Sequence, residues 1–119
     1  MLTFYNSNGN AIAYISDDNQ SIYLYNGTPV AWLSGENIYA YNGKYLGWIQ
    51  DGWVFDRNGT RAFFTENASG GPIKPVKAVR PVKGVRDVRP VRSVRETRPA
   101  RPVRSLNWSQ LSNNDYFNQ

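Results

Sequence analysis

The 119-residue sequence predicts an all-β protein: four β-hairpin repeats packed radially, followed by an extended, polyproline II-like basic arm. Three observations predict this fold class. Asn-Gly pairs recur at nearly regular spacing in the first half of the chain, and short apolar segments flank each pair. From residue 72 to residue 104 the period changes to three, with a Lys or Arg in every third place.

The Asn-Gly pairs are the predicted turns of four hairpins within residues 1–66. They are Asn8-Gly9, Asn26-Gly27, Asn42-Gly43 and Asn58-Gly59, with the glycines 18, 16 and 16 residues apart. Asn-Gly between apolar segments favours a type I′ turn, which requires positive φ at both central residues. The segments YNSNG and FDRNG, compared with YNG in the middle repeats, indicate that the first and fourth turns are two residues longer. We therefore expect eight short strands and no helix before residue 70.

The predicted strands are apolar on both faces. In the second strand of each hairpin one face holds large side chains, whereas the other holds Ala13, Ala31 and Gly47, with Phe63 breaking the pattern. Small residues at one level of each repeat indicate a crowded centre. Because no single repeat could bury both of its faces, we expect the repeats to pack around a common axis.

The repeat Tyr-Asn-Gly-x-x-apolar-small-aromatic-apolar resembles that of the 4-fold β-flower proteins. The resemblance covers about residues 2–66. It implies a small bacterial protein of four β-hairpins around a pseudo-four-fold axis. It implies no catalytic residues.

A linker at residues 67–71 leads into the predicted arm at residues 72–104, which repeats in triplets. The first slot is often Pro, the second mostly Val and the third always Lys or Arg. A strand would place the valines on both of its faces, and prolines would break a helix. Polyproline II has three residues per turn, so the valines would form one edge and the cations another. Such an arm would span roughly 100 Å.

Residues 105–119 form a polar C-terminal segment with a few large apolar side chains, Leu106, Trp108, Leu111, Tyr116 and Phe117. Two interpretations stay open for this segment. It is either an anchor that packs on the β module through its Trp and Leu residues, or a frayed end.

Charge is divided unevenly along the chain. Residues 1–70 sum to −3 and residues 71–104 to +9, and Asp115 brings the total to +5. The arm therefore holds the candidates for non-specific polyanion binding. These are Lys74, Lys77, Arg80, Lys83, Arg86, Arg89, Arg92, Arg95, Arg98, Arg101 and Arg104. A row of cations releases counterions from a phosphate backbone and so binds it in a salt-dependent way.

Two functions follow from the arm. The first is a non-enzymatic binding or scaffolding protein whose arm engages an anionic partner, such as nucleic acid or an anionic surface. The second is a structural, self-associating protein whose arm packs on its own or a neighbouring β module. For a docked arm we expect the valines from Val76 to Val94 to be buried and the cations to face water or module carboxylates.

Other function classes find no support in the sequence. The chain has neither Cys nor His, which excludes disulfides, thiolate or imidazole metal sites, and nucleophiles of the Cys or His type. No metal or cofactor and no enzymatic activity are predicted. The repeated aromatic residues are interpreted as packing, and Asn6, Asn26, Asn42 and Asp56 as turn residues. Neither a signal peptide nor a membrane span is recognised, so the sequence predicts a cytoplasmic protein.

Overall fold

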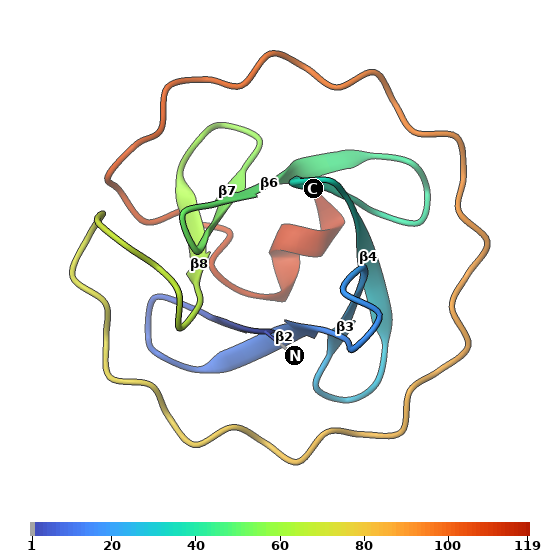
Figure 1. The fold of residues 1–119 in the computed structure, drawn as a ribbon, viewed down its shortest axis with the longest axis horizontal. Helices are drawn as coiled ribbons and strands as arrows, with labels where there is room; N and C mark the ends of the chain where they lie inside the picture. The colour runs from blue at the N-terminus through green and yellow to red at the C-terminus, as the bar shows by residue number, and fades with distance from the viewer. Residues whose placement is uncertain (1) are drawn as a thin grey trace.

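The computed structural model describes residues 2–119 and shows eight antiparallel strands that close into a barrel (Figure 1). The strands are β1 (Leu2–Tyr5), β2 (Ala11–Ile15), β3 (Ser21–Leu24), β4 (Pro29–Ser34), β5 (Asn37–Tyr39), β6 (Tyr45–Gln50), β7 (Trp53–Asp56) and β8 (Arg61–Phe64). Each strand pairs with the next, and β8 returns to β1. One 3₁₀ helix, η1 (Asn114–Asn118), follows, and residues 2–70 contain none. The all-β prediction is confirmed.

The four Asn-Gly turns lie at the outer ends of the hairpins, like the tips of petals (Figure 1). In each turn the glycine has a positive φ of 82–97°. The preceding asparagines do not, because among the described non-glycine residues only Asn19 and Asp51 have positive φ. The type I′ prediction is therefore wrong. The hydrogen bonds Gly9 N–H to Asn6 O and Asn6 N–H to Asn10 O, both 2.9 Å, instead fit a type I turn followed by a glycine bulge.

The four turns also have the same length, contrary to prediction. They begin at Asn6, Leu24, Ala40 and Asp56, each three residues before its glycine. The residues before those positions are the equivalent aromatics of the repeat, Tyr5, Tyr23, Tyr39 and Phe55. Tyr25 and Tyr41 lie inside their turns, and aligning them with Tyr5 creates a false insertion. The side chains of Asn6 and Asp56 accept backbone N–H groups of their turns, as the turn interpretation predicts.

Small residues form the crowded level expected in the core. Ala13 and Ala31 are fully buried among Phe4, Ile22 and Ile38. A Cβ on Gly47 would lie 1.9 Å from the Phe55 carbonyl oxygen and 2.6 Å from the Tyr116 hydroxyl. No side chain fits at Gly47, so the prediction for this level is confirmed.

The arm runs around the barrel just outside the four turns and closes almost a full circle (Figure 1). It contains neither helix nor strand, and its polyproline II conformation stays a prediction. The molecule is consequently a disc of 37 × 36 × 21 Å. After the arm the chain turns inward, and η1 lies at the centre of the ring of strands with Tyr116 fully buried.

Candidate functional site

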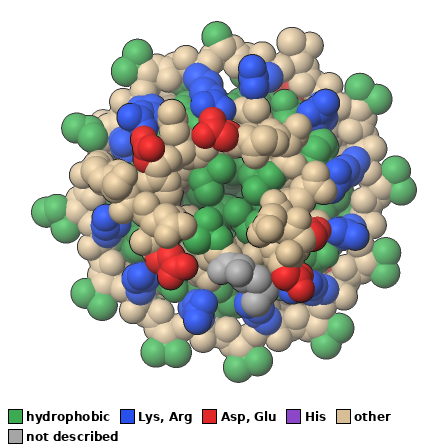
Figure 2. All heavy atoms as spheres, viewed as in Figure 1, with side chains coloured by type: hydrophobic (Ala, Val, Ile, Leu, Met, Phe, Trp, Pro, Cys, Tyr) green, Lys and Arg blue, Asp and Glu red, His purple; other side chains and the backbone are tan. Residues whose placement is uncertain are grey.

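The three slots of each triplet point in three directions. Second-slot side chains point outward and are 91–96% exposed, and we call them the rim: Ile73, Val76, Val79, Val82, Val85, Val88, Val91, Val94 and Val103. Third-slot cations point inward over the barrel. Figure 2 shows the cations in a circle inside the outline of the molecule and the apolar side chains protruding beyond it. The prediction that a docked arm buries its valines is wrong.

First-slot residues fasten the arm to the hairpin turns through their backbones. Every first-slot residue that is not proline donates its N–H to a turn carbonyl, at 2.6–3.0 Å. The pairs are Ala78–Gly9, Gly84–Tyr25, Asp87–Gly27, Ser93–Tyr41, Glu96–Gly43 and Ser105–Gly59, where Ser105 continues the first-slot series just beyond the arm. Four of the donors are nine residues apart, so three triplets match one hairpin. The remaining first slots are prolines, which have no backbone N–H to donate.

The arm backbone also lies directly on the turn glycines. A Cβ on Gly43 would be 2.0 Å from the Val94 carbonyl oxygen, and one on Gly27 would be 1.9 Å from that of Val85. Gly9 and Gly59 make the equivalent contacts with Val76 and Val103. These contacts again repeat every nine residues along the arm. The turn glycines therefore permit both the turn and the approach of the arm.

Inside the arm lies a layer of aromatic side chains, arranged as stacked pairs where neighbouring hairpins meet. We call it the aromatic layer: Tyr5–Phe64, Tyr14–Tyr23, Trp32–Tyr39 and Trp48–Phe55, with ring centroids 4.9–5.9 Å apart. All eight residues are buried, as the packing interpretation predicts. Each pair presents ring faces to the arm, and the face of an aromatic ring attracts cations.

Arm cations lie over this layer at the same nine-residue period. Lys77, Arg86, Arg95 and Arg104 lie 5.2–5.8 Å from the rings of Tyr5, Tyr23, Tyr39 and Phe55. A second series, Lys83, Arg92 and Arg101, lies 4.2–5.1 Å from Tyr14, Trp32 and Trp48. The closest contact is that of Arg92 with Trp32, at 4.2 Å. Cations in every quarter of the arm thus find aromatic partners.

Carboxylates in the loops between hairpins bind four of the arginines. The pairs are Arg86–Asp17 at 3.2 Å, Arg89–Asp18 at 2.9 Å, Arg101–Glu36 at 3.3 Å and Arg104–Asp51 at 2.8 Å. All are partly open to water, and ion pairs of this kind contribute little each. They explain how the negative module holds the positive arm in register.

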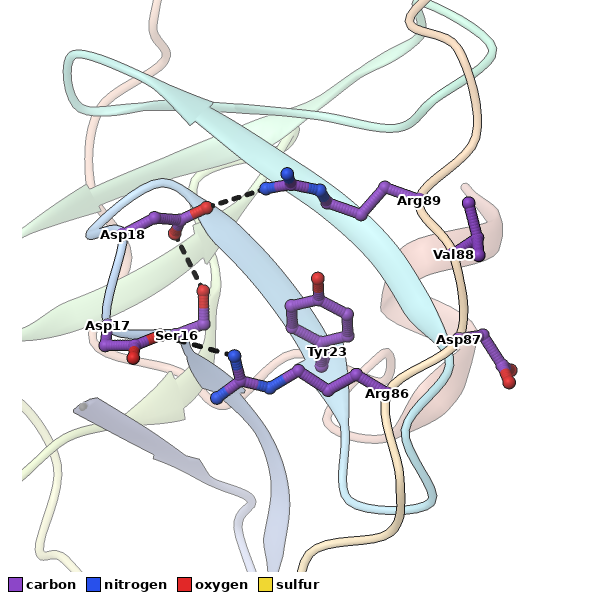
Figure 3. A pocket seen from close by; sticks show the side chains of 8 residues that line it. All are labelled: Ser16, Asp17, Asp18, Tyr23, Arg86, Asp87, Val88 and Arg89. Atoms are coloured by element: carbon purple, nitrogen blue, oxygen red, sulfur yellow. Dashed lines mark hydrogen bonds and ion pairs between the residues drawn. The ribbon is translucent and has the colours of Figure 1, made fainter.

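The cleft between the Asp17–Asp18 loop and the arm is shown in Figure 3, with Tyr23 between Arg86 and Arg89. Burial alone would raise the pKa of Asp18. Hydrogen bonds from Ser21, Ser16 and the Gln20 amide outweigh that effect and hold the pKa well below its usual range. Asp18 is therefore a carboxylate that the loop itself preorganises for Arg89.

Arg80 and Arg98 differ from the other arginines of the arm. Among the described residues neither forms a hydrogen bond or an ion pair, and they line open gaps beside Pro81 and Pro99. These gaps are open clefts of about 650 and 570 Å³ at the positions where the arm bridges two hairpins. Lys74, at the start of the arm, donates to the Ala68 carbonyl oxygen at 2.9 Å.

A buried polar cluster joins the C-terminal segment to the barrel. Arg61 is 4% exposed, lies 5.2 and 4.9 Å from the rings of Trp53 and Phe55, and donates to the Ser105 carbonyl oxygen. Burial lowers its pKa, and the charge of Arg104 adds to this effect. Asp56 accepts from the hydroxyls of Thr60 and Ser109. Sequence patterns do not reveal this cluster, because its partners come from segments about 50 residues apart.

Trp108 lies on Trp53 and Phe64, with ring centroids 5.4 and 6.1 Å apart, whereas Leu106 is 67% exposed. The Tyr116 hydroxyl donates to the Phe55 carbonyl oxygen at 2.7 Å. No group of three or more acidic side chains that could hold a metal ion occurs within residues 2–119. In the same part of the chain no helix has the length and hydropathy needed to cross a membrane.

In a comparison with protein families the chain matches the model described as 4-fold beta flower protein, over residues 2–117. Comparisons with curated proteins and with solved structures gave no match. The matched region includes the arm and most of η1 as well as the hairpins, and so extends well beyond the resemblance noted in the repeats. The chain belongs to the 4-fold beta flower family.

Proposed function

We propose that this is a non-enzymatic structural protein, a scaffold whose arm packs on its own β module. The observation that carries the proposal is the set of six backbone hydrogen bonds from first-slot residues to the hairpin turns. A free polyanion-binding tail would need no such register. The nine-residue match between arm and hairpins supports an arm that acts as a belt around the barrel.

The direction of the cations supports the same proposal. Seven arm cations lie over the aromatic layer, and four arginines have carboxylate partners in the module. A phosphate backbone would have to compete with these internal partners. Charge on the arm therefore serves the cohesion of the disc, and the predicted engagement of a polyanion by all eleven cations loses support.

Arg80 and Arg98 support a second, narrower candidate function. They have no carboxylate partner among the described residues and border open clefts, so they are available to an anionic partner. An anionic surface or nucleic acid would then contact two positions on the disc instead of a continuous row of charges.

Salt dependence of binding separates these functions. The full chain is titrated with a short DNA duplex and with heparin at about 50 and 200 mM salt. Eleven phosphate contacts would give a slope of log K against log salt of about −10, whereas two would give about −2. We expect a slope no steeper than about −2. The double variant Arg80→Gln, Arg98→Gln should abolish the remaining binding to the duplex and to heparin.

A control variant is Arg92→Gln, which removes a cation that lies over Trp32. It should leave polyanion binding unchanged and lower the melting temperature of the protein. A slope near −10, with Arg92→Gln binding as weakly as the double variant, would contradict the structural proposal and restore the arm as a polyanion-binding element.

A further inference from the structure

The rim is an apolar surface that the folded chain does not use for its own stability. Eight consecutive second slots, from Ile73 to Val94, hold only Ile or Val, and each side chain is more than nine-tenths exposed. These residues bury almost no surface in the disc. Regular exposed apolar side chains of this kind are typical of interaction surfaces.

The extended conformation of the arm does not require apolar side chains. A β-branched residue suits an extended backbone, and Thr is β-branched and similar in shape to Val. Thr97 occupies a second slot, is exposed, and lies next to Glu96, which keeps its hydrogen bond to Gly43. A polar side chain is therefore compatible with the docked arm. Contacts within the disc therefore do not account for Val in the other second slots, and a contact outside the disc would.

Charge does not prevent two rims from meeting, although the arm carries a sum of +9. The third-slot cations point away from the rim, toward the aromatic layer and the module carboxylates. At the edge of the molecule, apolar side chains protrude furthest (Figure 2). Two arms can therefore approach edge to edge with their cations directed into their own discs.

The spacing of the rim is matched by another copy of the same chain. Rim side chains recur every third residue, and first-slot backbone, often proline, separates them. Side chains of one rim fit between those of another only if both rims have the same spacing. A second copy of this chain has that spacing because its sequence is identical. Stable pairs usually bury more than about 1,000 Å² in total. Two convex discs of 37 × 36 Å touch along a short arc, so one contact is small and several per disc are needed.

We propose that the rim is a self-association surface through which discs assemble edge to edge, with Ile73 to Val94 as the contact row. This inference rests on the proposed function, because a rim exists only while the arm is docked. It adds the partner, a second copy of this chain, and the arrangement, a planar assembly in which each disc contacts more than one neighbour.

Sedimentation velocity and light scattering over a range of concentrations test the proposal on the full chain. The wild type should show assembly that grows with concentration. The triple variant Val79→Thr, Val85→Thr, Val91→Thr should weaken it at least about tenfold while keeping its melting temperature, because the three side chains are exposed in the single disc. Thr97→Val, which extends the contact row, should strengthen assembly.

Leu106→Ser is the matched control, because Leu106 is apolar and exposed but lies beyond the rim. It should assemble as the wild type does. A wild type that stays monomeric at every concentration, or a triple variant that assembles as well as the wild type, would overturn the proposal. Amide exchange of Ala78 and Glu96 is measured in the same samples. Protected amides in a monomeric protein reject self-association alone, whereas unprotected amides reject the proposed function as well.

Discussion

Gly43 meets two requirements at once, and the same is true of the three equivalent turn glycines. Its φ of 90° disfavours any side chain, and the arm backbone leaves no room for a Cβ. Gly35 has a φ of 60° in a loop between hairpins, where a Cβ would meet nothing within 4 Å. At Gly35 only the positive φ disfavours a side chain, whereas at Gly43 the arm backbone excludes one as well.

Comparing Gly43→Ala with Gly35→Ala isolates the contribution of the arm. Gly35→Ala should cost about 1–2 kcal/mol of unfolding free energy, from positive φ alone. Gly43→Ala should cost clearly more and should also expose the Glu96 amide, because the added methyl group displaces the Val94 carbonyl. Urea unfolding and amide exchange measure the two effects. Equal costs, with Glu96 still protected, would mean that the arm does not rest on the turn.

Tyr116 is the buried hydroxyl at the centre of the barrel. Burial raises its pKa well above the ordinary value of 10.0, and the nearby charge of Asp56 adds to the shift. Because the folded state holds this proton more tightly than the unfolded state, its contribution to stability is complete below pH 10 and is lost as the pH rises through the folded pKa. Burial likewise raises the pKa of Tyr25, Tyr41 and Tyr45.

We predict that Tyr116→Phe lowers the unfolding free energy at neutral pH by about 0.5–1.5 kcal/mol, through loss of the hydrogen bond to the Phe55 carbonyl. Above pH 10 the variant should lose stability less steeply than the wild type, because one titrating group is gone. Urea unfolding at both pH values measures the difference. A steeper alkaline loss in the variant would be incompatible with a buried neutral Tyr116.

At the scale of elements, the position of the arm depends on which first-slot residues have a backbone N–H to donate. Proline at a first slot suits the extended chain and lowers the entropy of the unfolded state, usually for a gain of about 0.4–1 kcal/mol. At Ala78 the same ring would meet the Gly9 carbonyl oxygen, which now accepts the Ala78 N–H at 2.9 Å. The alternation of proline and non-proline residues therefore encodes the register of the arm on the barrel.

This arrangement predicts that two proline changes differ in their cost and in their effect on the neighbouring amides. Ala78→Pro should lower stability by about 1 kcal/mol or more, because it loses a hydrogen bond and adds a clash. Pro81→Ala should cost no more than about 1 kcal/mol, from chain entropy alone, and should leave the neighbouring amides protected. Melting temperature and limited proteolysis of the arm compare the two. A stabilising Ala78→Pro would show that the arm is not held at Gly9.

Much of the hairpin module could be predicted from the sequence, because its signals are local. Asn-Gly pairs and apolar segments locate eight strands, and the small residue Ala31 falls at a fully buried position. The turn type was not predictable from Asn-Gly alone, since the pair also suits a type I turn with a glycine bulge. Register follows from the hydrogen bonds of the turn, and the Tyr-Asn-Gly pattern alone does not show that Tyr25 lies inside its turn.

Local sequence patterns do not predict which edge of the arm faces the barrel. A period of three establishes that the valines and the cations lie on different edges, but not which edge faces inward. Hydrophobicity alone favours buried valines. The aromatic layer decides otherwise, because its stacked pairs form only when neighbouring hairpins meet and then offer ring surfaces to Arg92 or Arg86. The same layer explains the repeated aromatics of the sequence.

At the scale of the whole molecule, the disc has three concentric zones. The barrel core and η1 lie at the centre (Figure 1). The aromatic layer with its cations surrounds them, and the rim lies outside (Figure 2). Each cation contact is worth about 0.5–1 kcal/mol at an exposed site, so no single one holds the arm. Cohesion comes from repetition of the same contacts around the barrel, which makes the docked arm a cooperative element.

Amide hydrogen exchange along residues 72–104, followed by NMR, tests the docked arm most directly. The account predicts protection at the first-slot amides that bond the turns, Ala78, Gly84, Asp87, Ser93 and Glu96, and at Ser105 just beyond. The amides of the rim valines donate to no backbone carbonyl within the described residues, and they should exchange at rates close to those of a free chain. Uniformly fast exchange across the arm, or protection without this pattern, would contradict the account.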